Sequence, residues 1–160
     1  MKILHVLLTQ LSIPPTDYGG TERVLWGLYQ GQKALGHEVK FITKNKSIHP
    51  DALYFDEKQS LESQIEGWAD IIHFHSEVEK EYPINTIYLS SRHADNYNAN
   101  CFVHNGLYWP DYGEPNFNPK HYVHFLAKAS WRIKNLQGSV RFAQKADMPM
   151  HILVVKRFNI

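Results

Sequence analysis

The first 43 residues contain a complete β-α-β pattern, and no other feature of the chain constrains its fold as strongly. Residues 2–8 (KILHVLL) form a short apolar run typical of a buried strand. Residues 21–35 place apolar side chains along one helical stripe, and Gly36 supplies a stop signal. Residues 38–43 (EVKFIT) then alternate as a second strand. Two strands joined through a helix pair in parallel, so this order predicts an α/β fold.

The alternation of strands and helices continues along the chain. Further strands are expected at 70–75, 86–89, 101–104, 122–126 and 150–155, and further helices at about 61–68, 90–97 and 133–145. The expected fold is therefore a Rossmann-like, mostly parallel sheet flanked by helices, with a partial second β-α-β unit. Residues 109–119 hold three prolines and one glycine. We therefore expect a first domain at 1–108, a linker at 109–120 and the incomplete start of a second domain at 121–160.

Composition excludes several classes of protein. The chain is 43% apolar and 21% charged, which is globular rather than disordered. No apolar run is long enough to cross a bilayer, and the N-terminus shows no signal-peptide pattern. Cys101 is the single cysteine, which excludes an internal disulfide and a cysteine-based zinc cage. These features favour a cytoplasmic protein.

Charge is distributed unevenly along the chain. Residues 1–119 carry nine lysines and arginines against fifteen acidic residues, a net charge of −6, whereas residues 120–160 carry a net charge of +7. An anionic partner such as phosphate, nucleic acid or a membrane surface is one explanation, and mutual attraction of the two portions is the other. The basic portion lacks a recognisable nucleic-acid-binding module, so nucleic acid is not expected as a partner.

Ligands of open parallel sheets bind beyond the carboxyl ends of the strands, and one such end leads into two glycines. Gly19 and Gly20 directly precede the first predicted helix. Glycines let a backbone approach a ligand closely, and a helix start favours phosphate. An ordinary turn is the alternative, because the sequence is neither a dinucleotide fingerprint nor a P-loop.

Two histidines stand at the end of another predicted strand. His73 and His75 share one face of that strand, where they suit substrate hydrogen bonding, general-base catalysis or a metal. No third ligand stands at a recognisable spacing, so no metal site is expected. A pair of structural histidines is the alternative interpretation.

Three cations lie between a predicted strand and the helix at about 133–145. They are Lys128, Arg132 and Lys134. Cations at a helix start oppose the helix dipole, by about 0.3–1 kcal/mol each, unless an anion is bound there. The segment therefore indicates a phosphate site more than a solvated surface.

Taken in order, these features resemble the family 4 glycosyltransferases, which have a GT-B fold and use nucleotide sugars. The resemblance covers most of the chain, and its motifs are 18–24 (YGGTERV), 35–39 (LGHEV), 70–75 (DIIHFH), 103–106 (VHNG), 125–128 (FLAK) and 134–135 (KN). On the donor side it implies that Gly19 and Gly20 approach the donor diphosphate. Lys128 and Lys134 would neutralise that diphosphate, which is a form of electrostatic catalysis.

On the acceptor side the resemblance implies that His75 is catalytic, beside the acceptor or the reacting sugar. Thr21 and His73 would lie on the same side. Family members retain the anomeric configuration and generally need no catalytic metal, so we expect no cofactor beyond the nucleotide-sugar donor. The implied partners are that donor and a glycan or lipid-linked acceptor in polysaccharide or lipopolysaccharide assembly. Peripheral association with the inner face of a membrane, and a homodimer or domain-swapped oligomer, stay open as hypotheses.

The sequence also departs from the family pattern. Glycines of the family are replaced at Ala127 and at Val154-Val155, and the chain ends at Ile160, before the position of a glutamate pair that holds sugar and ribose. We therefore expect a glycosyltransferase-like protein that is inactive or partial as this chain alone. The alternative is a non-catalytic nucleotide-binding, anion-binding or assembly module with half of a GT-B fold. An NAD-dependent oxidoreductase is disfavoured because the sequence lacks G-x-G-x-x-G.

Overall fold

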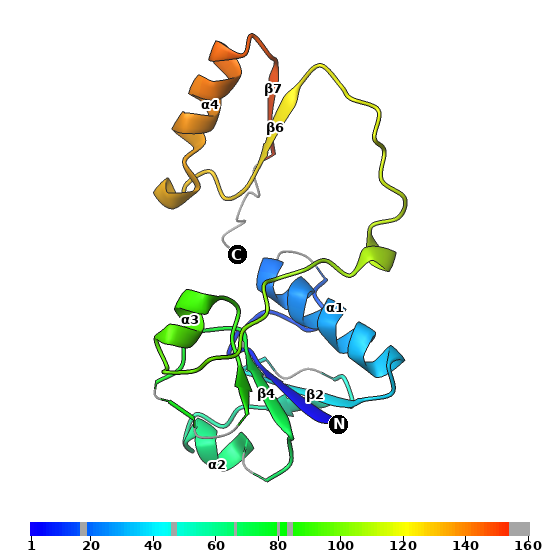
Figure 1. Ribbon diagram of the computed structural model, residues 1–160, viewed down its shortest axis with the longest axis vertical. Helices are drawn as coiled ribbons and strands as arrows, with labels where there is room; N and C mark the ends of the chain where they lie inside the picture. Colours follow the sequence, from blue (N-terminus) through cyan, green and yellow to red (C-terminus); the bar gives the residue numbers. More distant parts are fainter. Residues whose placement is uncertain (17–18, 46–47, 66, 80, 83–84, 154–160) are drawn as a thin grey trace. The chain divides into compact units, whose positions relative to one another are not determined.

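The computed structural model describes residues 1–16, 19–45, 48–65, 67–79, 81–82 and 85–153, which form two compact units divided after Gly113. The first unit is a parallel sheet of order β3-β2-β1-β4-β5 (Figure 1). Its strands are β1 (Lys2–Val6), β2 (Glu38–Thr43), β3 (Ala52–Tyr54), β4 (Ile71–Phe74) and β5 (Thr86–Ile87). Its helices are α1 (Gly20–Ala34), α2 (Leu61–Ile65), α3 (Ser91–Asp95) and the 3-10 helix η1 (Trp109–Asp111).

Side chains of the central strand β1 alternate between two separate cores. Leu4 and Val6 pack in one core with residues of α2 and α3, whereas Ile3 packs in the other with Leu25 and Tyr29 of α1. Helices therefore cover both faces of the sheet, with α1 on one side and α2 and α3 on the other (Figure 1). This confirms the predicted Rossmann-like α/β fold.

Two details of the predicted sheet are wrong. Strand β3 is not predicted by the sequence, since it has only three residues and lies at the sheet edge. The strand predicted at 101–104 does not form. In its place, Phe102 makes an isolated parallel bridge with Tyr88. Both segments are too short for periodicity to decide their conformation.

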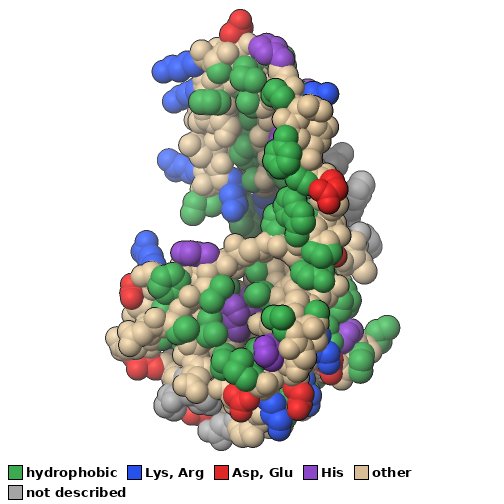
Figure 2. All heavy atoms as spheres, turned by 45° about the vertical axis from the view of Figure 1, so that its right-hand side comes forward, with side chains coloured by type: hydrophobic (Ala, Val, Ile, Leu, Met, Phe, Trp, Pro, Cys, Tyr) green, Lys and Arg blue, Asp and Glu red, His purple; other side chains and the backbone are tan. Residues whose placement is uncertain are grey.

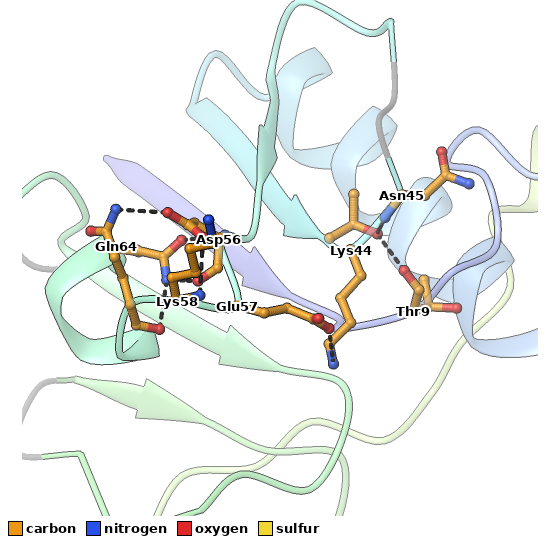
Figure 3. Close-up of polar contacts among 9 residues, drawn as sticks. Thr9, Lys44, Asn45, Asp56, Glu57, Lys58 and Gln64 are labelled. Carbon is orange, nitrogen blue, oxygen red and sulfur yellow. Dashed lines mark hydrogen bonds and ion pairs between the residues drawn. The ribbon is translucent and has the colours of Figure 1, made fainter.

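The loops at the carboxyl ends of β1, β2 and β3 are tied together by polar contacts (Figure 3). The backbone N–H of Lys44 donates to the carbonyl of Thr9 at 3.1 Å, and Lys44 Nζ lies 2.8 Å from Glu57 Oε1. The N–H of Asp56 donates to Gln64 Oε1 at 2.8 Å. The edge of the sheet where ligands of this fold class bind is therefore fixed by local contacts.

The second unit contains a two-stranded parallel sheet and one α-helix. Its elements are β6 (Val123–Leu126), the 3-10 helix η2 (Arg132–Lys134), α4 (Leu136–Lys145) and β7 (Met150–Leu153). The helix begins at Leu136 rather than at the predicted 133, because Asn135 adopts a left-handed conformation (φ 52°) and ends η2. Among the residues described in this unit, Phe125 and Ala143 are the buried hydrophobic ones. The predicted partial β-α-β unit is confirmed, and its core is small.

Candidate functional site

Gly19 and Gly20, referred to below as the glycine loop, lead into a helix as predicted. Helix α1 begins at Gly20, and Gly19 occupies the position before it without a side-chain cap. A Cβ atom on Gly19 would lie 2.8 Å from Glu22 Oε2, whereas one on Gly20 would meet nothing within 4 Å. The space beside Gly20 is therefore open to an approaching ligand, and the space beside Gly19 is occupied by a side chain of the same helix.

That side chain is a carboxylate in the first turn of α1. Glu22 is buried, and its Oε1 accepts a hydrogen bond of 2.7 Å from Thr9 Oγ1. Negative charge at a helix start is favourable, so Glu22 complements the dipole of α1. It also repels phosphate near Gly19. A donor diphosphate would therefore have to approach beside Gly20 and Thr21, which is half-buried in the same turn.

The two predicted histidines lie together and are joined by a third. His73 belongs to β4 and His75 follows it, and parallel register places His5 of β1 opposite His73. The ring centroids of these three histidines are 4.3 to 5.4 Å apart. His5 Nδ1 and His75 Nε2 share a hydrogen bond of 2.9 Å, and His5 Nε2 lies 2.7 Å from Gln32 Oε1 of α1. The three side chains form a histidine cluster beneath α1.

Burial keeps the histidine cluster uncharged. Burial lowers the pKa of His5 to about 4, and the hydrogen bond with Gln32 opposes that change in part. Burial lowers the pKa of His73 to about 3, with a smaller contribution from neighbouring histidines. The pKa of His75 also falls well below its usual value, again chiefly through burial. All three imidazoles are neutral at pH 7.

Exposure and hydrogen bonding bear on the catalytic role predicted for His75. Its side chain is only 4% exposed, and its Nε2 is already hydrogen-bonded to His5. His73 is equally buried. Their predicted acceptor-side and catalytic roles stay predictions. Either role requires that a substrate reach these side chains, which are only 4% exposed in this conformation.

The sequence missed His5. It lies on the same face of β1 as Ile3, so it points toward α1. Pairing between the first strand and the strand near residue 73 is the information that would have found it. Ligand atoms of His5, His73 and His75 all lie within 4.8 Å of one another, which makes this set able to hold a metal ion.

The predicted phosphate-binding lysines both belong to the second unit. Lys128 follows β6 and is half-buried, with its Nζ 4.5 Å from the ring centroid of Trp131. Lys134 is exposed at the end of η2. Figure 2 shows lysine and arginine side chains along one side of the unit that holds these residues. Gly19 and Gly20 belong to the first unit, so the residues predicted for the donor site belong to different units.

The start of α4 differs from the predicted arrangement. Asn135 caps it, because Asn135 Oδ1 accepts a hydrogen bond of 3.1 Å from the N–H of Gly138. Lys128 and Lys134 therefore precede a helix start that already has a cap. Their positive charges remain available to an anion.

An aromatic cavity that the sequence did not predict lies beside the glycine loop. Its volume is about 340 Å³, within the range of small-molecule sites, and its lining combines three aromatic rings with one guanidinium and one carboxylate. The lining residues are Pro14, Pro15, Arg23, Trp26, Tyr108, Asp111 and Tyr112. A larger cavity of about 750 Å³ lies at the β5 edge of the sheet, away from the predicted site residues. In the described part of the chain, no helix has the length and apolar character needed to cross a membrane.

Comparison with known proteins indicates a fold. No protein-family model and no curated protein matches the sequence. Among solved structures, the chain is similar to AviGT4, a glycosyltransferase involved in avilamycin A biosynthesis, with a TM-score of 0.62 and 16% sequence identity. The similarity covers 93% of this chain and 55% of AviGT4, so the chain spans about half the length of that structure. At this identity the likeness concerns the fold alone. The chain therefore has a glycosyltransferase-like α/β fold.

Proposed function

We propose that this protein acts in sugar transfer, with a nucleotide sugar as donor and a glycan or lipid-linked molecule as acceptor. The observation that carries the proposal is the structural likeness to a glycosyltransferase over 93% of the chain. The open space beside Gly20 at the start of α1 and the basic segment before α4 support it. Both features suit the diphosphate of a donor.

The proposed chemistry depends on charge. When the bond between sugar and nucleotide breaks, negative charge develops on the leaving diphosphate. Lys128 and Lys134 would offset that charge, and backbone N–H groups near Gly20 would add hydrogen bonds. We propose retention of the anomeric configuration from the family resemblance, with no step assigned to a metal.

A second candidate is a non-catalytic module that binds nucleotide diphosphate. The burial of His75 favours it, because the side chain predicted to be catalytic is only 4% exposed. Both candidates bind diphosphate, and only the first transfers sugar.

Diphosphate binding is the first test. We expect the double variant Lys128→Ala/Lys134→Ala to bind nucleoside diphosphates and inorganic pyrophosphate about 100- to 10,000-fold more weakly, since charged hydrogen bonds contribute about 1.5–3 kcal/mol each. The matched control is Arg141→Ala/Lys145→Ala, which removes the same charge from exposed positions of α4. Isothermal titration calorimetry measures both. Equal losses in the two variants would show that net charge alone drives binding.

Sugar transfer is the second test. The purified chain is incubated with radiolabelled nucleotide sugars and with glycan or membrane-lipid acceptors, and labelled product is counted. Transfer that disappears in Lys128→Ala/Lys134→Ala supports the enzyme. Diphosphate binding without transfer supports the non-catalytic module. A wild-type chain that binds no diphosphate contradicts both candidates.

A further inference from the structure

The histidine cluster has a chemistry that the proposed function does not use. Three imidazoles from β1 and from the end of β4 meet beneath α1, with exposed fractions of 0% to 4%. Among the described residues, His73 Nε2 and His75 Nδ1 are buried without any hydrogen-bond partner. Buried nitrogen atoms without partners are rare in folded proteins, and a bound ion is one physical reason for the unpartnered His73 Nε2.

We propose that His5, His73 and His75 bind one divalent transition-metal ion of the zinc class. Imidazole nitrogen is a preferred zinc ligand, and three histidines form a known type of zinc site. From the sequence, a metal is one of the uses that His73 and His75 suit, and it is not expected only because no third ligand stands at a recognisable spacing. The pairing of β1 with β4 supplies that ligand.

Distances between the ligand atoms support this site. His5 Nδ1 lies 2.9 Å from His75 Nε2, and one ligand atom from each of the three histidines lies within 4.8 Å of the others. Two nitrogens bound to one zinc ion in tetrahedral geometry lie about 3.3 Å apart, given Zn–N bonds of roughly 2.0–2.1 Å. The observed distances, from 2.9 Å to at most 4.8 Å, lie on both sides of that spacing.

Gln32 prepares His5 to bind metal. His5 Nε2–H donates to the carboxamide oxygen of Gln32 at 2.7 Å, so the lone pair of His5 lies on Nδ1, toward His75. Metal-binding histidines usually donate their second ring N–H to a carbonyl or carboxylate in this way. Gln32 is a positioning residue here, and it also lines a groove of about 310 Å³ between α1 and residues 106–108.

The electrostatic state of the histidine cluster is the one that a metal needs. Only neutral imidazole binds metal, and burial lowers the pKa of His5 to about 4. All three ligands are uncharged, so a bound ion would keep its full charge, and three protein ligands would leave a fourth coordination position for water or a small anion. Because its ligands come from β1 and from the end of β4, the ion would join the two strands and stabilise the fold.

Zinc binding to the full chain, freed of metal by chelation and of any affinity tag, is the primary test. Isothermal titration calorimetry and metal analysis by mass spectrometry should find one Zn²⁺ per chain, and the melting temperature should rise when Zn²⁺ is added. Mg²⁺, which prefers oxygen ligands, should neither bind nor raise the melting temperature. A folded chain that takes up no Zn²⁺ overturns the proposal.

Variants assign the binding to these residues. His5→Gln and His73→Gln should each weaken Zn²⁺ binding at least 10-fold, and Gln32→Leu should weaken it by about 10-fold through loss of the positioning contact. His104→Gln, at an exposed histidine, is the matched control and should leave binding unchanged. If His104→Gln loses as much affinity as His5→Gln, surface binding explains the result and the proposal fails.

A spectroscopic measurement on the wild-type chain covers the case in which a histidine variant does not fold. Co²⁺ substituted for Zn²⁺ gives intense visible absorption in a four-coordinate site and weak absorption in an octahedral, water-rich one. The intense spectrum supports the histidine cluster, and the weak spectrum overturns it. None of these measurements depends on nucleotide diphosphate or on sugar transfer, so the metal site and the proposed function can fail separately.

Discussion

At the scale of single residues, the three imidazoles of the histidine cluster accept protons less readily in the folded protein than in the unfolded chain. Unfolding exposes all three imidazoles and returns their pKa values to about 6.5. The unfolded chain therefore binds more protons than the folded chain once the pH falls below that value. Stability contributed by the neutral cluster is fully present above pH 6.5 and is lost as the pH falls toward the folded pKa of His5, about 4.

We expect the free energy of unfolding of the first unit to drop steeply between pH 6.5 and pH 4. His5 alone accounts for roughly 3 kcal/mol, because its pKa falls from 6.5 to about 4 and each pH unit corresponds to about 1.4 kcal/mol. Urea denaturation followed by circular dichroism at several pH values, without added metal, measures it. His5→Gln should flatten the profile, and the exposed control His104→Gln should not. A wild-type profile that is flat over this range would contradict the buried, neutral state.

Only part of the histidine cluster could be predicted from the sequence. His73 and His75 alternate on one strand, so their shared face follows from local geometry. His5 and His75 are 70 residues apart, and their contact depends on which strands are neighbours in the sheet. Strand order is decided by tertiary packing, so no local pattern contains it. The burial of Glu22 beside Gly19 was not predicted either, because a charged residue in the first turn of a helix is normally solvated.

At the scale of elements, α1 provides a close-packed surface for the segment that follows residue 105. A Cβ atom on Gly27 would lie 2.6 Å from Tyr108 Cβ, so only glycine permits this approach. A Cβ atom on Gly31, one turn further along, would meet only the edge of the Tyr108 ring at 3.9 Å. The two glycines therefore form a matched pair with similar helix propensity and different surroundings.

We expect Gly27→Ala and Gly31→Ala to change stability in opposite directions. Gly27→Ala should destabilise by about 1–3 kcal/mol, because the added methyl group collides with Tyr108. Gly31→Ala should stabilise by up to about 1 kcal/mol, because alanine favours the helix and the space is free. Thermal denaturation of both variants checks this, with Tyr108→Gly as a second-site change that should rescue Gly27→Ala. Equal effects of the two alanines would mean that Tyr108 does not pack against α1.

Long helices and strands were predicted from the sequence better than short ones. Helix α1 and strand β2 combine strong periodicity with clear stop signals, and they form within a residue or two of the predicted bounds. Strand β3 and the bridge at Phe102 are too short to carry a period, and pairing with neighbours decides them. Helix α4 begins later than predicted because Asn135 adopts a left-handed conformation, which ends η2 and allows α4 to begin at Leu136.

At the scale of the whole molecule, the two units differ in how much apolar surface they bury. The first unit has cores on both faces of its sheet, whereas Phe125 and Ala143 are the buried hydrophobic residues described in the second. Several large apolar side chains of the second unit are exposed, among them Phe117 and Ile133 at 87%. Since burial is the main source of stability, the second unit should open more readily.

We expect backbone amide hydrogens of the intact chain to exchange more slowly in the first unit than in the second. Backbone N–H groups of β1 and β4 should exchange slowest, and those of β6 and β7 about 100-fold faster or more, because fewer contacts must break to expose them. Mass spectrometry of peptides from β1, β4, β6 and β7 measures the difference. Comparable protection in β1 and β6 would show that the second unit has stabilising contacts beyond its own small core.

The central position of β1 has a consequence for biosynthesis. Strand β1 leaves the ribosome before β4, yet β4, whose residues begin at Ile71, is one of its two neighbouring strands. At translation rates of roughly 5–20 residues per second, several seconds pass between the appearance of the two strands. During that interval an apolar strand with one unpaired edge is exposed to other chains, which is a recognised route to aggregation. A chaperone that covers the nascent strand β1 would therefore raise the yield of this protein more than one that acts after release.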